Sequence, residues 1–527
     1  MSKSRGEELL ETLVNGEDSD IKPQSRMEEY LLAAIKKYGT DGLPKPISRG
    51  DALLHQLVDV VSNSSGGGEE PDVETKGVNF YDYDGTLLHT YTVAEAQELT
   101  ELPELPTQEG LICQCWNWTL EDIKAQNSEL DVGAVYITDD GKTRIYIKVD
   151  EPINPIICMN LERGTAVIDW GDGTDTETLE QGYTRKSNRH EYSPGNYTIT
   201  ITLLDNSTFS IKESYIYGCL FCYDDVNDCR NYRIFNSIQK IEFGRGLRSI
   251  NRYSLRYLEC LKTITIPKDV EYLQNGDNLF SGCESLKSIV IPNGAKTLNG
   301  WFNSCKSLKI CSIPKSVTTL NNTWKDCTSL ERITLSNNVT TYQATGILNG
   351  CSSLKRVILS NADISGMSYI FKNCSSLEEI ILPDGSTAVP TGTFSGCTSL
   401  KNISLPNSIS KIDSNGFEYC HSLKCIELPD SITSIGIYAF YSCKKLYKIK
   451  MPSNITSINS IAFRNCQYLS FVDFSNSTSV PSLASINAFE EIPPDFEILV
   501  PASLYEEWIA ATNWSTIADN IKAKENS

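Results

Sequence analysis

Histidine, positive charge and long apolar runs are scarce in this 527-residue sequence. Its four histidines, His55, His89, His190 and His421, are scattered, which leaves little material for histidine metal sites or acid–base chemistry. Lys and Arg total 47 against 67 Asp and Glu, and the net charge of −20 disfavours nucleic acid and anionic membranes as partners. No apolar run of about 18 residues occurs and none follows a basic start, so we expect neither membrane insertion nor a secretory signal.

The length indicates about three to four domains. The sequence has 18 cysteines, but in a chain this long without a signal we expect them to stay reduced. Cys219, Cys222 and Cys229 have a loose zinc-like spacing without a convincing fourth ligand, and Cys113 and Cys115 are equally unpersuasive as ligands. We therefore predict no metal and no cofactor.

The first 66 residues repeat the pattern Ser-Arg-x-acidic three times, each time before apolar residues at helical spacing. Such pairs cap helix N-termini: Ser4 with Glu7, Ser25 with Glu28, and Ser48 with Asp51. Short helices are marginal alone, so they must dock on something. We predict a helical anchor over 1–66 that forms a homo-oligomer, for instance a trimer, with a small autonomous helical domain as the alternative. Residues 67–75 follow as a flexible linker.

Residues 76–149 change to a period of two and contain the stretch FYDYDGTL from Phe80. It resembles the D-x-D-G-T motif of haloacid-dehalogenase-type phosphatases, in which Asp82 would be the nucleophile. Alternating flanks and the Asp84-Gly85 pair instead predict a hairpin, and Asp140-Gly141 predicts a second one. A short capped helix is expected from Thr119. We interpret 76–149 as a β-hairpin-rich module and keep the phosphatase as a remote alternative.

The next segment, 150–213, contains WGDGT from Trp170 and then HEYSPGNYTITI from His190. Both halves resemble the PKD family of immunoglobulin-like β-sandwiches. The resemblance implies a β-sandwich that acts as a spacer or adhesive unit. Asp169 and Asp172 are candidate calcium ligands, although carboxylates that form a turn are the better explanation.

From 237 to 501 the sequence is a repeat array. Cysteines recur every 22 to 24 residues, each with a leucine three positions later and a bulky apolar residue three positions earlier: Cys283, Cys305, Cys327, Cys351, Cys374, Cys397, Cys420, Cys443 and Cys466. The unit resembles the BspA-type leucine-rich repeat, which implies a solenoid of short strands. Stacked cysteines then form a core column rather than metal ligands. We expect caps at 214–236 and 502–527, the second opened by Ser503 with Glu506 and packed through Trp508 and Trp514.

The predicted fold class is mainly β and multidomain: N-terminal helices, a small β-rich module, a PKD-like sandwich, and a leucine-rich-repeat solenoid with a helical C-terminal cap. This architecture indicates a binding protein, so we predict no catalytic residues. Candidate binding residues lie at outward strand positions and adjacent turns of the solenoid: Lys287, Trp301, Lys309, Arg332, Tyr342, Arg356, Tyr369, Glu379, Asn402, Lys424 and Lys448.

Two settings fit a binding protein of this kind. The Ser-Arg-x-acidic segments resemble the anchors of phage fibre proteins. The first prediction is therefore a head or tail fibre of a virion, with the N-terminus bound to capsid or tail proteins and the solenoid bound to a protein or glycan of the host surface. The alternative is a BspA-like adhesin on a bacterial cell surface.

Overall fold

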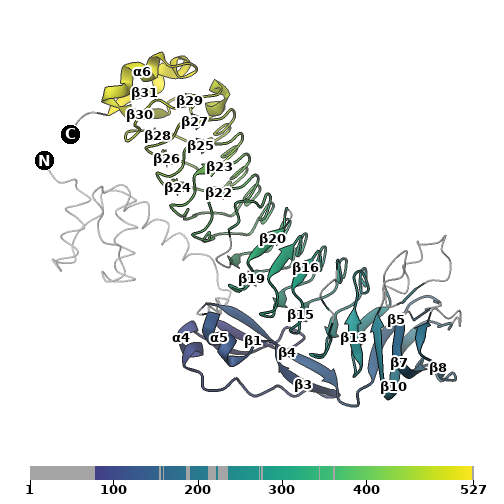
Figure 1. Cartoon of the computed structure of the whole chain (residues 1–527). Helices are drawn as coiled ribbons and strands as arrows, with labels where there is room; N and C mark the ends of the chain where they lie inside the picture. Colours follow the sequence, from purple (N-terminus) through teal and green to yellow (C-terminus); the bar gives the residue numbers. More distant parts are fainter. Residues whose placement is uncertain are drawn as a thin grey trace, which may run out of the picture. The chain divides into compact units, whose positions relative to one another are not determined.

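A computed structural model describes residues 77–126, 128–153, 156–157, 159–184, 190–211, 221–222, 236–271, 273, 277–343, 345–359 and 363–524. All of these belong to one compact unit, 75–527, and are mainly β (Figure 1). The predicted anchor residues Ser4, Glu7, Ser25, Glu28, Ser48 and Asp51 lie outside the described residues. No helix in the described part of the chain is long and apolar enough to span a bilayer.

The first element group is a four-stranded sheet with two helices, here called the N-terminal module. Its strands are β1 (Val78–Tyr81), β2 (Leu87–Tyr91), β3 (Leu111–Trp116) and β4 (Leu130–Thr138), in the order β2-β1-β4-β3. Helices α4 (Val93–Glu98) and α5 (Leu120–Gln126) complete it, and Thr119 Oγ1 caps α5 by accepting the Asp122 N–H at 3.2 Å. A core around Phe80, Trp116 and Trp118 holds these elements together.

The FYDYDGTL stretch forms the expected hairpin, because β1 pairs antiparallel with β2 across it. Asp84 Oδ1 accepts the Thr86 N–H at 2.9 Å and Gly85 has φ +91°, a turn conformation that glycine permits. The alternating pattern that was expected on both sides of the motif is wrong for its first strand. Strand β1 is fully buried and pairs in parallel with β4, so the motif does follow a buried parallel strand.

The second expected hairpin, at Asp140-Gly141, is not formed. Strand β4 stays in the module, whereas β5 (Thr143–Val149) pairs with β10 (Gly195–Ile211) and β12 (Ile238–Glu242) in another sheet. The 140–141 turn is instead held by the Arg245 N–H, which donates to the Gly141 carbonyl at 3.0 Å. The chain therefore passes from one sheet to the next at a point where the sequence pattern alone suggests a reversal within one sheet.

The larger sheet has the order β14-β12-β5-β10-β7-β8. It contains β7 (Met159–Asp169), β8 (Glu177–Leu179) and β14 (Thr263–Thr265), with β9 (Gly182–Thr184) on β7 and β13 (Leu247–Ile250) on β10. The short strands β6 (Ile156–Ile157) and β11 (Phe221–Cys222) pair separately. The two halves of the WGDGT and HEY motif meet, since the Trp170 and His190 rings stack at 4.5 Å and Tyr192 Oη donates to the Trp170 carbonyl. The PKD resemblance itself stays a prediction.

This sheet runs directly into the solenoid. Strand β5 pairs antiparallel with β12, the first solenoid strand, and one continuous core extends from Ile145 to Ile521. An exposed strand edge is a template for unwanted pairing, and β5 covers that of β12. Apart from β11, the segment 214–236 lies outside the described residues, save for its last residue, Asn236.

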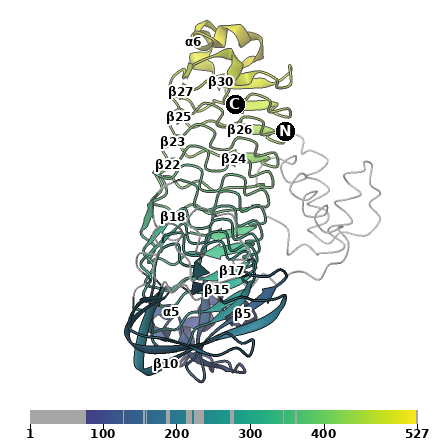
Figure 2. The ribbon, with the colours of Figure 1, turned by 90° about the vertical axis from the view of Figure 1, so that its right-hand side faces the viewer.

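The solenoid has about twelve turns and carries two series of short parallel strands (Figure 2). The first, here called the front face, comprises β14 and then β15 (Ser288–Val290), β17 (Ile310–Ser312), β19 (Arg332–Thr334), β21 (Arg356–Ile358), β24 (Cys425–Glu427), β26 (Lys448–Lys450), β28 (Phe471–Asp473), β30 (Glu497–Pro501) and β31 (Ile521–Lys524). The second comprises β16 (Thr297–Asn299), β18 (Thr319–Asn321), β20 (Thr341–Gln343), β22 (Ala388–Val389), β23 (Lys411–Ile412), β25 (Ser434–Ile435), β27 (Ser457–Ile458) and β29 (Ser482–Leu483).

Stacked side chains fill the interior of the turns. The rings of Phe394, Phe417 and Phe440 stack with centroids 5.2 Å apart. All nine repeat cysteines are buried, and each thiol donates to a backbone carbonyl of the preceding turn at 3.0–3.2 Å. Burial raises the pKa of the Cys283 thiol to about 12. The cysteine column is therefore the core element that the repeat pattern predicts.

The C-terminal end is covered as expected, with a difference at its start. Trp508, on α6 (Tyr505–Ala510), and Trp514, which opens the 3-10 helix η3 (Trp514–Asn520), are both fully buried against Phe474. The Ser503–Glu506 capping box is not formed, because η2 (Ala502–Leu504) precedes α6 and no side chain caps it. A further 3-10 helix, η1 (Ile486–Phe489), lies in the last repeat.

Candidate ligand-binding surface

The front face of the solenoid is covered in its early turns. Ser288, Val290, Ser312 and Thr334 occupy outward positions of β15, β17 and β19, yet all four are buried. The cover is the N-terminal module, whose strand β4 lies across β15 and β17 (Figures 1 and 2). Side chains that point away from the solenoid core in these turns therefore lie in the interface with the N-terminal module.

Close packing and hydrogen bonds hold this cover in place. A Cβ atom on Gly133 would lie 2.5 Å from Val290 Cγ2, so β4 approaches the solenoid more closely than any other residue type allows. Trp118 Nε1 donates to the Ile313 carbonyl at 2.9 Å, and Asn117 Nδ2 donates to the Ile291 carbonyl at 3.1 Å. Buried polar groups of the module are thus satisfied by the solenoid.

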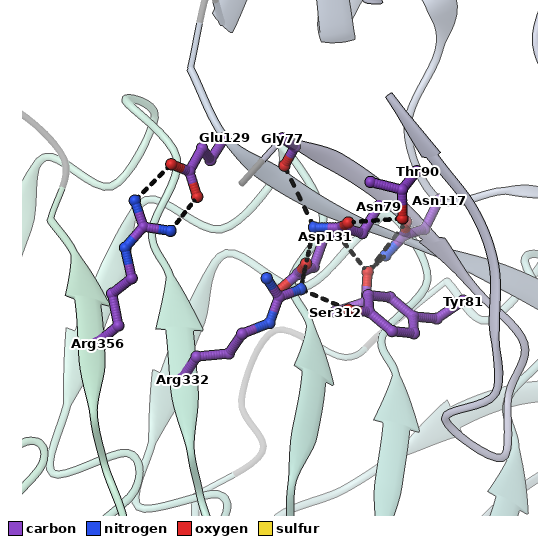
Figure 3. Close-up of polar contacts among 10 residues, drawn as sticks. All are labelled: Gly77, Asn79, Tyr81, Thr90, Asn117, Glu129, Asp131, Ser312, Arg332 and Arg356. Atoms are coloured by element: carbon purple, nitrogen blue, oxygen red, sulfur yellow. Dashed lines mark hydrogen bonds and ion pairs between the residues drawn. The ribbon is translucent and has the colours of Figure 1, made fainter. Parts of the chain in front are cut away.

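Ion pairs complete the contact (Figure 3). Asp131 is 7% exposed and binds Arg332, whose guanidinium also donates to Tyr81 Oη. Arg356 makes a bidentate pair with Glu129, at 2.5 and 2.6 Å. Arg332 and Arg356, predicted as ligand-binding residues, are therefore committed to the module. Their positive charges neutralise Asp131 and Glu129 of the module. The repeat pattern of the sequence does not show that these two arginines have partners outside the solenoid.

The other predicted binding residues divide by exposure. Trp301 is fully buried, and its assignment to the binding surface is wrong because its ring packs on Phe280 and Phe302. Tyr342 is half-buried against the core. The remaining candidates are exposed: Lys287, Lys309, Tyr369, Glu379, Asn402, Lys424 and Lys448. Among them Lys309 pairs with Glu331 at 3.3 Å.

Beyond β21 the same face is open. Ile381 occupies the outward position that Val290 and Ser312 occupy in earlier turns, and it is 79% exposed. Ser404, its bridge partner in the next turn, is also exposed. The module ends its contacts before these turns, so the front face from Glu379 to Asp473 is available to a ligand.

Aromatic and basic side chains gather in the turns around β24, β26 and β28. Between residues 419 and 471 the sequence has five lysines and one arginine against two acidic residues, although the whole chain has a net charge of −20. We define the tyrosine–lysine surface by its rings and charges: Tyr419, His421, Tyr438, Tyr441, Lys444, Lys445, Tyr447, Lys448, Tyr468 and Phe471. Tyr447 is 60% exposed and Tyr468 is 64% exposed.

Four of these rings form one cluster. Tyr441 lies edge-on to Tyr419 at 5.4 Å and to Tyr438 at 5.5 Å, and Tyr419 lies edge-on to His421 at 6.0 Å. Tyr419 and Tyr438 both have φ +58°. Glycine or asparagine occupies the position of Tyr419 in several other turns, as Gly396 and Asn465 do. The positive φ is a feature of the repeat turn, since Ser304, Asp326 and Ser442 also adopt it at this position, and a non-glycine residue there costs about 1–2 kcal/mol of backbone energy.

The lysines of the surface are not neutralised by carboxylates. In the described part of the chain, Lys444, Lys445 and Lys448 form no ion pair, and Lys448 Nζ lies 4.9 Å from the Phe471 ring centroid. Partial burial, together with the charge of Lys444, lowers the pKa of His421. His421 is therefore neutral at pH 7, and the positive charge comes from the lysines.

The FYDYDGTL stretch has a structural role in the module. Asp82 is buried and its carboxylate is occupied, accepting Gln108 Nε2 at 2.6 Å and the Tyr83 N–H at 2.7 Å. Within the described ranges no group of three His, Cys, Asp or Glu residues is arranged to hold a metal ion. Asp82 thus stabilises a turn of the module.

The sequence signal that was missed for the tyrosine–lysine surface is the local excess of Tyr and Lys from 419 to 471.

Comparisons with known proteins agree with the repeat architecture. The model of the BspA type leucine rich repeat region matches residues 196–276, 248–367 and 365–490, which together are more than half of the chain. No curated protein matches. Similar solved structures include a leucine-rich repeat protein from Bacteroides ovatus, with 22% identity over 60% of this chain and 91% of that one, at a TM-score of 0.40.

Two further solved structures have lower similarity. A leucine rich cell surface protein from Faecalibacterium prausnitzii has 21% identity over 51% of this chain and 88% of that one, with a TM-score of 0.32. The pneumococcal vaccine antigen PcpA has 16% identity over 62% of this chain and 86% of that one, with a TM-score of 0.38.

Proposed function

Since the chain belongs to the family of BspA-type leucine-rich repeat proteins, we propose that it is a binding protein displayed on a bacterial cell surface. The solenoid presents the ligand-binding side chains, and the N-terminal module stiffens its first turns. Repeat solenoids suit this role because outward residues vary without disturbing the core. Among the exposed candidates, Glu379, Asn402, Lys424 and Lys448 lie on the open part of the front face, from Glu379 to Asp473.

The observation that carries this proposal is the contrast along the front face. A protein that needed only a stable body would leave short polar side chains in the uncovered turns. Instead Ile381, Tyr447 and Tyr468 are the most exposed large hydrophobic residues of the described chain. Exposed apolar surface of this kind marks interaction sites.

The virion fibre is the second candidate. Its support is the Ser-Arg-x-acidic pattern in 1–66. The family match covers residues 196–490, outside this pattern, and it supports the bacterial cell surface, the setting that the sequence placed second.

A location experiment separates the two settings. Intact cells that produce the protein are treated with protease, and the chain is followed by antibodies against residues 379–473. On a cell-surface protein this epitope is lost from intact cells. Co-purification with virions, and full protection in intact cells, would contradict the proposal.

We also propose that residues 1–66 make the protein a homo-oligomer, for instance a trimer. Light scattering of the full chain is compared with that of a chain lacking residues 1–70. The full chain should have a multiple of the monomer mass and the shortened chain the monomer mass. A monomeric full chain would contradict this part.

A further inference from the structure

We propose that the tyrosine–lysine surface binds an anionic polysaccharide, with the lysines contacting its carboxylate or sulfate groups and the tyrosine rings contacting its sugar rings. This inference rests on the proposed function as a surface binding protein and adds the chemical class of the ligand. Three features of the surface support it: the unpaired lysines, the exposed tyrosine rings, and the turn positions that these rings occupy.

The charge of this region is opposite to that of the chain. In an earlier part of the solenoid exposed lysines have carboxylate partners, as Lys306 has Glu284 and Lys309 has Glu331. By contrast Lys444, Lys445 and Lys448 lie within five residues and form no ion pair in the described ranges. Three neighbouring lysines without carboxylate partners create a local positive potential in an otherwise acidic chain, and this potential attracts anionic ligands.

The rings add a second kind of contact. Tyr447 and Tyr468 expose most of their side chains beside these lysines, and the Tyr447 N–H and Tyr447 carbonyl bond to the neighbouring turns, which fixes the backbone under the ring. The face of an aromatic ring is electronegative and attracts polarised C–H groups, which sugar rings present on their flat sides. Tyr hydroxyls and Lys ammonium groups then supply hydrogen bonds to sugar oxygens.

The rings of Tyr419 and Tyr438 stand at turn positions where most other turns have small or polar residues. The repeat turn imposes a positive φ at both positions, as it does at Ser304 and Asn415. With Tyr441, the two rings form an edge-to-face cluster on the surface rather than in the core. These turns therefore present an aromatic surface that the repeat itself does not require.

Two other anionic polymers fit less well. A peptide that binds by adding a strand needs an open strand edge, but β26 is paired on both sides, with β24 and β28. Double-stranded DNA carries one charge per ~1.7 Å and would be repelled by the rest of a chain with net charge −20. A polysaccharide with a charge on each sugar has a lower charge density and presents no backbone amides that need a strand edge.

Binding of the full chain to five immobilised polymers tests this inference: polygalacturonate, dextran sulfate, neutral dextran, poly-L-glutamate and duplex DNA. We expect binding to polygalacturonate or dextran sulfate that weakens with added salt, and little binding to the other three. The stronger of the two anionic glycans identifies carboxylate or sulfate as the preferred group.

Two double variants locate the site. Lys445→Gln with Lys448→Gln, and Tyr447→Ala with Tyr468→Ala, should each weaken glycan binding roughly tenfold, since two exposed contacts are lost. The control is Lys306→Gln with Lys325→Gln, which removes the same charge from exposed positions of earlier turns and should leave binding unchanged. An unchanged thermal unfolding midpoint in all three variants shows that the fold is intact.

Three outcomes would overturn the inference. Equal losses in the control and the Lys445/Lys448 variant would show general charge attraction. Equal or stronger binding to poly-L-glutamate or DNA would assign the surface to another polymer. Binding to none of the polymers, by a chain that the protease experiment places on the cell surface, would reject the glycan and leave the proposed function standing.

Discussion

The front face of this solenoid has two halves that differ in the solvent exposure of their outward side chains. From β15 to β21 the outward side chains are buried or half-buried under the N-terminal module, and from Glu379 onward most of them are exposed to solvent. The repeat pattern that places them is the same in both halves. Four of the covered outward residues are Ser288, Val290, Ser312 and Ile358, whereas Glu379, Asn402, Glu427 and Lys450 occupy the open half.

The difference shows that the position of a residue within a repeat determines whether its side chain points outward, but does not determine whether that side chain is exposed to solvent. Small and apolar outward residues let β4 lie against the face, and charged ones keep the open half soluble. Arg332 and Arg356 are exceptions in the covered half because Asp131 and Glu129 neutralise them. The following predictions test this comparison.

The largest effect is expected when a charge is placed under the module. Ser312 is fully buried and Ser404 is exposed at the same repeat position, four residues after Leu308 and Leu400. Ser312→Glu buries an uncompensated carboxylate and should lower the free energy of unfolding by about 3–5 kcal/mol, whereas Ser404→Glu should change it by no more than about 0.5 kcal/mol. Urea denaturation measures both. Similar effects at the two sites would contradict the division of the face.

The next effect concerns the buried ion pair. Asp131→Ala leaves Arg332 without its main partner and should cost about 2–3 kcal/mol, less than for a fully buried pair because part of the guanidinium stays in solvent. A double-mutant cycle with Arg332→Ala isolates the coupling. The control is Glu378→Ala, which breaks an exposed 2.8 Å pair with Lys401 in the open half and should cost at most about 1 kcal/mol. A coupling near zero for Asp131 and Arg332 would contradict the contact.

A smaller effect is expected from the close approach of β4. Gly133→Ala introduces a Cβ atom that would overlap Val290, and overpacking of this kind costs about 1–3 kcal/mol. Val290→Ala removes the atoms that would clash, so the double variant should recover most of that loss. Thermal unfolding of the two single variants and the double variant measures this, and additive losses would count against direct contact.

The smallest effect is a pH dependence. Partial burial raises the pKa of Asp122, but hydrogen bonds from Lys315 and from Thr119 outweigh it, so the pKa is lowered. The contribution of Asp122 to stability is therefore complete above its unfolded pKa of ~3.9 and is lost as the pH falls through the folded value.

Asp122→Asn should accordingly reduce stability by less than about 1 kcal/mol at pH 7, and by a smaller amount at pH 3 than at pH 7. Urea denaturation at pH 3, 5 and 7 follows the difference between the two chains. A difference that persists unchanged at pH 3 would mean that the side chain acts through packing rather than through its charge.

Much of the fold was predictable because its signals are local or repeated. The Cys and Phe columns identify the solenoid, since every turn must bury the same positions. The Asp84-Gly85 hairpin and the α5 cap depend on neighbouring residues only. The Asp140-Gly141 hairpin was predicted wrongly because β5 pairs with β10 and β12, 46 or more residues further along the chain, instead of with β4. A turn motif does not specify which strand becomes the partner.

The candidate site was predicted less well for the same reason. Trp301 and Arg332 satisfy every sequence rule for an outward or turn residue, yet one is in the core and the other faces the module. The sequence by itself determined that the chain is a leucine-rich-repeat solenoid and which side chains point outward, because a repeat of 22 to 24 residues imposes one geometry on each turn. Only the tertiary structure decided which outward residues remain exposed, since the module covers them through contacts about 200 residues apart in the chain, such as Asn117 with Ser312 and Asp131 with Arg332.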